Sequence, residues 1–176
     1  MSDIWYTSDT HFGHANIIKF CRPEFTDVME MTLKLIDNWN SRVKPHDVVY
    51  HGGDLFWRHP PEGWDEEEWA CWVGDQLHGR IRLILGNHDN AKLLIEKGLV
   101  ESICAWGYFK KEGFVQTHFP LPWNQTPPGF VNVHGHTHNN QDNDPHQINI
   151  CVEHTLYHPV HRDELMQVVT TTKQLM

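Results

Sequence analysis

The sequence predicts an α/β fold, organised as a single domain over residues 1–176. Three observations lead to this expectation. A chain of 176 residues has the length of one compact domain with a hydrophobic core. Short apolar segments alternate with helical patterns in its first half, as they do in α/β proteins. Strand-like segments dominate the second half, and no repeat or low-complexity linker divides the chain.

Six short apolar segments have the length and composition of β-strands. They are Ile4 to Thr7, Asp47 to His51, Arg80 to Leu85, Phe114 to Thr117, Phe130 to Val133 and Ile148 to Val152. A helical pattern from Asp163 to Val169 follows the last of them.

A helix is predicted where Val28, Met31, Leu35 and Trp39 repeat at the spacing of one helical face. Thr26 precedes this pattern. We expect its hydroxyl to cap the first turn, because free backbone N–H groups at a helix start need an acceptor.

The segment from Trp64 to Leu77 has a stronger helical signature. Asp65 and Glu68 have the spacing of a capping box, and Trp64 and Trp69 have the spacing of a hydrophobic staple. A cage of tryptophans around a ligand is an alternative interpretation. The helical spacing favours packing in the core instead.

A proline-rich segment, residues 119–129, separates two of the predicted strands. Proline lacks a backbone N–H group and has a fixed φ angle, so it interrupts both helices and strand ladders. The sequence therefore predicts a loop, and whether this loop acts as a lid stays open.

The composition limits the partners of the chain. The formal net charge is −9, and an acidic body of this kind is not expected to bind long duplex nucleic acid, which requires many contacts between phosphates and Lys or Arg. Histidine is abundant, with 15 residues against 14 for Lys and Arg together. Because several histidines cluster locally with Asp and Asn, the composition favours a metal site.

The four cysteines lie far apart and form no Cys-x-x-Cys pair, so we expect free thiols with no zinc or redox role. The first residues lack the basic and apolar regions of a signal peptide, and no apolar run approaches the ~20 residues that span a bilayer. A cytoplasmic location and no membrane partner are expected.

Polar residues follow five of the predicted strands, at the point where each strand ends. In open α/β sheets, ligand sites form at these carboxyl ends. The five segments are Asp9-Thr10-His11, Gly52-Gly53-Asp54, Gly86-Asn87-His88-Asp89, His118 and Gly135-His136-Thr137-His138.

Two of these segments contain metal-binding residue types at a spacing of two. In extended backbone, residues two apart point to the same side, so Asp9 and His11 are expected to reach one metal ion. His136 and His138 are expected to form a second pair that points to the same side. Each segment alone is weak, whereas five in order, each at a strand end, form a strong combined signal.

The series resembles the calcineurin-like metallophosphoesterase family, whose pattern is Asp-x-His, Gly-Asp, Gly-Asn-His-Asp/Glu, His and Gly-His-x-His. All five blocks are present between Asp9 and His138 without substitution. The flanking segments, residues 9–14 and 132–139, also resemble small bacterial and phage members. The resemblance implies two mixed β-sheets packed as a sandwich and flanked by helices.

The resemblance also implies two divalent metal ions that share Asp54. It assigns Asp9, His11, Asp54 and His138 to one ion, and Asp54, Asn87, His118 and His136 to the other. Oxygen and imidazole ligands without thiolate suit Mn²⁺, which we expect, or Fe, Zn²⁺, Co²⁺ or Ni²⁺.

The expected reaction is hydrolysis of small phosphodiesters or phosphomonoesters, nucleotide-like ones in particular. A hydroxide that bridges the two metal ions would attack phosphorus. His88 would protonate the leaving oxygen or stabilise its charge. Asp89 would either orient His88 or cap the turn.

Two further residues are candidates for contacts with the substrate. His14 and Arg22 follow the first metal segment closely. Arg22 would suit a phosphate clamp, because its guanidinium group is forked and always charged. The alternative is an ordinary surface arginine before Pro23.

Two other functions compete with hydrolysis of a small phosphate ester. One is a nuclease acting on single-stranded DNA or RNA, against which the acidic composition argues. The other is a non-catalytic, metal-binding interaction scaffold, against which the intact His88 and ligand set argue. The sequence leaves open the physiological substrate, the preference for monoesters or diesters, the native metal and the oligomeric state.

Overall fold

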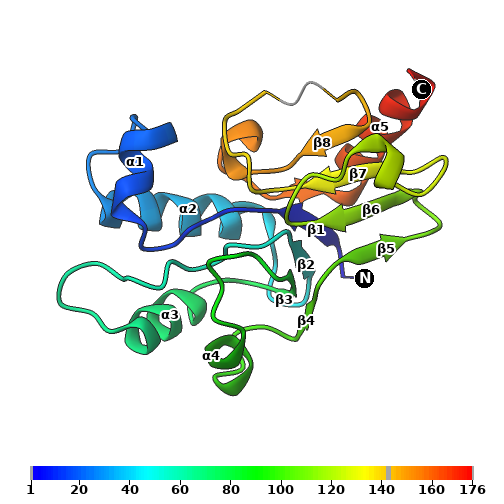
Figure 1. Cartoon of the computed structure of the whole chain (residues 1–176). Coiled ribbons are helices and arrows are strands. Elements are labelled where there is room, and N and C mark those ends of the chain that lie inside the picture. Colours follow the sequence, from blue (N-terminus) through cyan, green and yellow to red (C-terminus); the bar gives the residue numbers. More distant parts are fainter. Residues whose placement is uncertain (1, 142–143, 176) are drawn as a thin grey trace.

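Two mixed β-sheets form the centre of the structure, a computed structural model that describes residues 2–141 and 144–175 (Figure 1). The first sheet has the order β4-β3-β2-β1-β9, from strands β1 (Ile4–Thr7), β2 (Val48–His51), β3 (Arg80–Ile84), β4 (Ser102–Cys104) and β9 (Val160–His161). The second sheet has the order β5-β6-β7-β8, from strands β5 (Gly107–Phe109), β6 (Phe114–Thr117), β7 (Val131–His134) and β8 (Gln147–Asn149). Neighbouring strands are parallel, except that β9 is antiparallel to β1 and β5 to β6. The expected pair of mixed sheets is confirmed.

Helices flank the sheets, as expected. They are α1 (Ala15–Cys21), α2 (Val28–Arg42), α3 (Glu66–Gly74), α4 (Ala91–Glu96) and α5 (Arg162–Gln174). Two short 3-10 turns are η1 (Trp123–Gln125) and η2 (Val152–Thr155). Figure 1 shows α5 beside the second sheet, on the side of the molecule away from α3 and α4. In the described part of the chain, no helix has both the length and the apolar character needed to cross a bilayer.

Strand β1 contributes to two separate hydrophobic cores because its side chains alternate between the two faces of the first sheet. Trp5 belongs to the core shared with helices α1 to α4. Tyr6 belongs to the core that also contains Phe114 and Val131 of the second sheet and Leu165 of α5. The first sheet is therefore covered on both faces, and its carboxyl edge is where polar residues can meet.

The start of α2 differs from the expected cap. Asp27, rather than Thr26, is the N-cap, and its carboxylate accepts hydrogen bonds from the backbone N–H groups of Met29 and Glu30 at 2.8 Å. Thr26 lies one residue too early to reach these groups. Its own N–H and hydroxyl groups donate to the Glu30 side chain instead.

The start of α3 follows the prediction in part: Asp65 is the N-cap, but among the described residues the return bond of a capping box, from the Asp65 N–H group to the Glu68 side chain, is absent. The Asp65 carboxylate accepts from the Glu68 N–H group at 2.8 Å, and the rings of Trp64 and Trp69 lie 5.4 Å apart, as in a hydrophobic staple. Trp69 is fully buried in the core, which supports the packing interpretation over a ligand cage. The helix ends at Gly74, before the predicted limit at Leu77.

The other differences concern short elements and element ends. Helices α1 and α4 and strands β4, β5 and β9 contain two to seven residues each, too few to show a periodic pattern. The predicted strand from Ile148 to Val152 ends at Asn149 in β8, and η2 begins at Val152. Helix α5 extends to Gln174, beyond the predicted end at Val169. Its last turns are polar, so the apolar spacing used for the prediction does not reach them.

Asp47 anchors the beginning of β1 to the loop before β2. Its carboxylate accepts hydrogen bonds from the Asp3 N–H group at 2.9 Å, the Trp5 indole at 3.0 Å and the Lys44 N–H group at 2.9 Å. Burial opposes the charge, but these hydrogen bonds outweigh it and lower the pKa of Asp47 below its ordinary value.

Replacing Asp47 with Ala is expected to lower the free energy of unfolding by about 2–3 kcal/mol at pH 7, because three donors, among them the buried Trp5 indole, lose their acceptor. Since the pKa of Asp47 is lowered in the folded state, its stabilisation is present above the unfolded pKa and disappears as the pH falls through the folded one. Urea denaturation at pH 7 and pH 3 should therefore show a smaller difference from wild type in acid. Asp37→Ala, at an exposed position on α2, is the control, and equal stability of all three proteins at pH 7 would contradict the expectation.

Candidate metal centre

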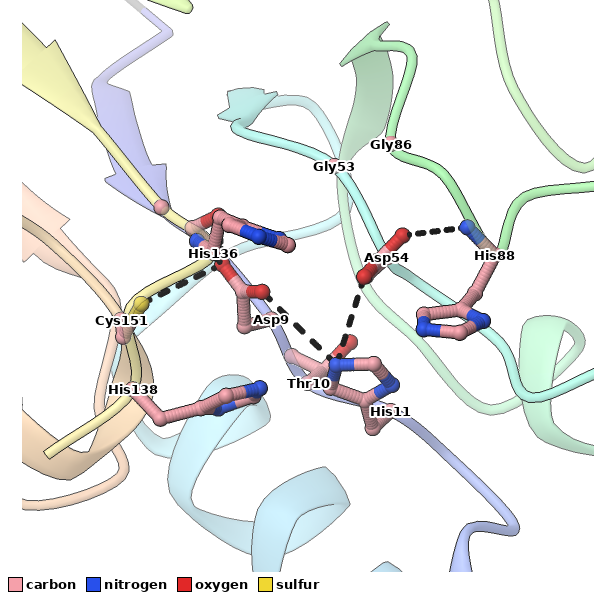
Figure 2. Close-up of polar contacts among 12 residues, drawn as sticks. Asp9, Thr10, His11, Gly53, Asp54, Gly86, His88, His136, His138 and Cys151 are labelled. Atoms are coloured by element: carbon pink, nitrogen blue, oxygen red, sulfur yellow. Dashed lines mark hydrogen bonds and ion pairs between the residues drawn. The ribbon is translucent and has the colours of Figure 1, made fainter. Parts of the chain in front are cut away.

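The polar segments predicted from the sequence meet at one edge of the structure. Strands β1, β2 and β3 of the first sheet and β6 and β7 of the second all end there, and each is followed by one of these segments. The segments after β1 and β2 run side by side, because the N–H groups of Asp9 and His11 donate to the carbonyl groups of Gly53 and Asp54 at 3.0 Å. The rings and carboxylates then converge on one region (Figure 2).

The backbone of these segments is left-handed rather than extended. The φ angles are 57° at Asp9, 48° at His11, 57° at Asp54, 69° at His136 and 49° at His138. The expectation of extended backbone at the two spaced pairs is therefore wrong. Positive φ is uncommon outside glycine and is typical of functional sites, where surrounding contacts maintain it.

Asp9, His11 and His138 form the first group of candidate ligands. One potential ligand atom from each lies within 4.8 Å of those of the others. Oδ2 of Asp9 accepts hydrogen bonds from the Ser8 hydroxyl, from the His136 N–H group at 2.9 Å and from the Cys151 thiol at 3.3 Å. These bonds fix the carboxylate, and Oδ1 faces Nε2 of His11 at 3.7 Å.

Asp54, His118 and His136 form the second group, again within 4.8 Å of one another. Asn87 joins it, because its Oδ1 lies 2.9 Å from Nε2 of His118. Oδ2 of Asp54 lies 3.4 Å from the same nitrogen and 3.5 Å from Nε2 of His11 in the first group. Asp54 thus lies between the two groups, and the structure brings all seven candidate ligands together.

Several buried atoms at this edge have the environment of metal ligands. Within the described residues, Oδ1 of Asp9 and both ring nitrogens of His11 are buried without a hydrogen-bond partner. His118 lies 3.0 Å from the carbonyl group of Gly52 through Nδ1, which must donate there. In the neutral ring, the Nε2 lone pair then faces the oxygens of Asn87 and Asp54. Only a positive charge makes this arrangement favourable, so the residues present fit a metal ion.

The ionisation states agree with this fit. Burial lowers the pKa of His11, so its imidazole is neutral at pH 7. Burial opposes the charges of Asp9 and Asp54, but neighbouring histidines outweigh it and hold the pKa of both carboxyls below their ordinary value. Burial also disfavours charge on His118, yet Asp54 and Asp9 raise its pKa above the ordinary value. A metal ion would replace that proton.

Two glycines of the motifs allow the carboxylates to approach the backbone. A Cβ atom at Gly86 would lie 2.2 Å from Oδ1 of Asp54, and one at Gly135 would lie 2.1 Å from Oδ2 of Asp9. Any side chain at either position would therefore displace a candidate ligand.

His88 lies beside the shared carboxylate. Its N–H group donates to Oδ1 of Asp54 at 2.8 Å, and its ring lies 5.5 Å from that of His11 (Figure 2). The ring of Trp57 lies 4.4 Å from that of His88. The His88 ring thus lies next to His11 of the first group, while the backbone amide orients Asp54.

Asp89 is a turn anchor and does not orient His88. Its two oxygens accept hydrogen bonds at 2.8 Å from the N–H groups of Asp54, Leu55 and Gly86. With its acceptors occupied by backbone, the carboxylate joins the segment after β3 to the segment after β2. Burial raises the pKa of Asp89 to about 6.

His14 lies next to the first group. Its ring stacks on Trp57 at 3.6 Å and lies 5.4 Å from the ring of His11. Burial, followed by the charges of neighbouring His11 and His88, lowers the pKa of His14 to about 3. A contact with substrate stays a prediction for this residue.

Arg22 has a different place from either one expected. Its side chain is fully buried, so the surface interpretation is wrong. The guanidinium group donates to the carbonyl groups of Thr10 at 2.9 Å and Asp9 at 2.5 Å and to Glu153 at 2.8 Å. Because its nitrogens bind the protein itself, a phosphate clamp is not supported. Arg22 instead stabilises the segment after β1, in which Asp9 and His11 have positive φ angles.

Glu153 is a residue of the site that the sequence did not indicate. Its Oε1 lies 3.1 Å from Nδ1 of His138 and accepts the bond from Arg22. The N–H group on Nδ1 leaves Nε2 of His138 free to bind a metal ion, the usual role of such a carboxylate. Burial opposes the charge, but His138 and Arg22 outweigh it and lower the pKa of Glu153 to about 2. No motif marks a glutamate 15 residues after its histidine.

Replacing Glu153 with Gln is expected to weaken Mn²⁺ binding at the first group about tenfold, because the amide no longer favours the correct tautomer of His138. Calorimetric titration of the metal-free protein would measure the affinities of both sites. Glu62→Gln, at an exposed position, should bind like wild type. Identical titrations of the Glu153 variant and wild type would rule out this positioning role.

Comparison with known proteins places the chain in a family. The model of the calcineurin-like phosphoesterases matches residues 2–168. An uncharacterized protein of Methanocaldococcus jannaschii is 34% identical over 181 residues, covering 98% of this chain and 94% of that protein. The Gene 66 protein of Mycobacterium phage D29 is 25% identical, with 99% of each chain covered. The crystal structure of a protein of unknown function from Aquifex aeolicus has a TM-score of 0.72 and 25% identity, covering 96% of this chain and all of that one. The chain belongs to the calcineurin-like phosphoesterase family.

Proposed function

We propose that the chain is a metal-dependent hydrolase of small phosphate esters, with two divalent ions that share Asp54. The observation that carries this proposal is the position of Asp54, whose Oδ2 lies 3.5 Å from His11 and 3.4 Å from His118, between two groups of candidate ligands. Oxygen and imidazole ligands suit several divalent ions, of which Mn²⁺ is the one we expect.

The local charge favours a phosphate ester although the whole chain carries a net charge of −9. Two divalent ions with the carboxylates of Asp9 and Asp54 leave a net charge of about +2. The charge of the distant surface is screened beyond ~8–10 Å in physiological salt. The attraction at the centre is therefore the larger effect for a small substrate, whereas a long polyanion would also meet the acidic surface.

The chemistry requires a water nucleophile, stabilisation of charge on phosphorus and a proton for the leaving oxygen. Bound divalent ions lower the pKa of water and neutralise phosphoryl oxygens. His88 supplies the proton or a hydrogen bond to the leaving oxygen, because its backbone N–H group binds Asp54 and its ring lies 5.5 Å from that of His11. Trp57 packs between His14 and His88 and limits the motion of both rings.

The Asp54→Asn variant tests the shared carboxylate. Hydrolysis of bis-(p-nitrophenyl) phosphate with added Mn²⁺ is expected to fall by about 10²-fold or more, because both groups lose an anionic ligand. A chelator should abolish the wild-type activity, and added metal should restore it. Asp37→Asn on the exposed face of α2 should retain full activity. A wild-type protein that binds metal but hydrolyses no ester with any divalent ion would favour the scaffold alternative.

The His88→Ala variant tests the proton donor. We expect kcat for an alkyl phosphate ester to fall by about 10²–10⁴-fold, the usual contribution of acid catalysis. The loss should be much smaller for a p-nitrophenyl ester, because nitrophenolate leaves without a proton. Metal affinity should persist, since the backbone N–H group that orients Asp54 is retained. Equal losses for both esters would contradict the proposed role, and His46→Ala at an exposed position is the control.

A further inference from the structure

A cavity of about 480 Å³ opens beside the second group of candidate ligands. Its walls come from the ends of β3 and β6, from the turn between β4 and β5, and from the proline-rich loop. The residues that line it are Leu85, Ala105, Trp106, Val115, Thr117, His118, Phe119, Leu121, Gln125 and Pro127. This volume lies within the range of about 300–1,000 Å³ found for small-molecule sites.

The lining is mostly apolar and aromatic, and its polar members are Thr117, His118 and Gln125. None of the residues that line the cavity is Asp, Glu, Lys or Arg, in a chain where charged residues make up 21% of the sequence. Trp106 and Phe119 are 56% and 51% exposed, so large aromatic surfaces remain available to a ligand. A cavity of this kind favours an uncharged, flat group over a phosphate or a sugar.

The cavity is continuous with the candidate metal centre. His118 lines it and is also a member of the second group. The ring of Phe119 lies 4.9 Å from that of His118 and 4.3 Å from that of His136. A molecule with its phosphate at the metal centre would therefore place its organic part against Phe119.

The proline-rich loop is held in place by hydrogen bonds, so the cavity wall is formed in advance. Leu121 donates its N–H group to Asn132 at 2.7 Å, and its carbonyl group accepts from Gln147 at 2.8 Å. The Thr117 hydroxyl donates to the carbonyl group of Phe119 at 2.6 Å. A preformed wall lowers the entropic cost of binding a ligand.

We infer that this cavity binds an uncharged aromatic ring, such as a nucleobase or aryl group, in the substrate whose phosphate binds at the metal centre. The inference rests on the proposed function and narrows its substrate class to phosphate esters that carry such a ring. Trp106 and Phe119 are the specificity residues, and the proline-rich loop is a binding wall.

Binding of phosphonates to the Mn²⁺-loaded protein tests this inference without turnover, because the carbon–phosphorus bond resists hydrolysis. Phenylphosphonate is expected to bind about tenfold more tightly than methylphosphonate, since its ring can stack on the aromatic wall. Cyclohexylphosphonate should have an intermediate affinity, because its ring is apolar but not flat. Calorimetric titration would measure the three dissociation constants.

The Trp106→Ala variant should bind phenylphosphonate about fivefold more weakly and methylphosphonate as tightly as wild type does. Trp123→Ala is the matched control, because Trp123 is a tryptophan of similar exposure, 54%, that lies on the proline-rich loop and does not line the cavity. Equal affinity of phenylphosphonate and methylphosphonate in wild type, or an unchanged preference in Trp106→Ala, would overturn the inference and leave the metal centre intact. Failure of every phosphonate to bind the loaded protein would instead contradict the proposed function itself, and with it the inference.

Discussion

The pairing of the segments that follow β1 and β2 is the constraint on which the candidate centre depends. Two hydrogen bonds, from Asp9 to Gly53 and from His11 to Asp54, place carboxylates and imidazoles from two strands within a few ångströms. The left-handed backbone at these residues is unfavourable for side chains with a Cβ atom. Arg22 offsets this cost, because its guanidinium group binds the carbonyl groups of Asp9 and Thr10 from the buried side.

Buried acceptors that face one another weaken the folded state unless a positive charge lies between them. Asp54 and Asp9 are buried in the same small volume, with His11 between them. The chain holds them there with donors on the outer side only: Ser8, Cys151 and the His136 amide for Asp9, and the His88 amide for Asp54. Oδ1 of Asp9 has no hydrogen-bond partner, and Oδ2 of Asp54 faces the rings of His11 and His118. A divalent ion is thus expected to stabilise the fold as well as to serve the reaction.

The sequence predicts the sheets and the polar edge because both depend on local patterns. A short apolar segment followed by Gly and Asp, as at Asp54, indicates the end of a strand. This signal does not depend on the tertiary structure. The left-handed backbone and the places of Arg22, Asp89 and Glu153 depend on long-range contacts. Arg22 reaches Glu153 across 131 residues, and Asp89 reaches Asp54 across 35. The sequence leaves Arg22 as a phosphate clamp or a surface arginine and Asp89 as a partner for His88 or a turn cap. Only the tertiary structure shows that both side chains bind distant backbone groups.

Two adjacent regions at this edge of the structure differ in the charge of the residues that form them. The candidate metal centre is rich in ionisable groups, whereas the cavity next to it lacks Asp, Glu, Lys and Arg. His118 belongs to both regions, through its Nε2 atom to the centre and as part of the lining to the cavity. A phosphate and an aromatic ring joined by a short link would satisfy both at once, whereas inorganic phosphate would use only the first. Trp106 and Phe119 stay exposed to solvent beside a polar centre. Exposed apolar surface of this kind marks a binding site, which supports a ligand with both groups.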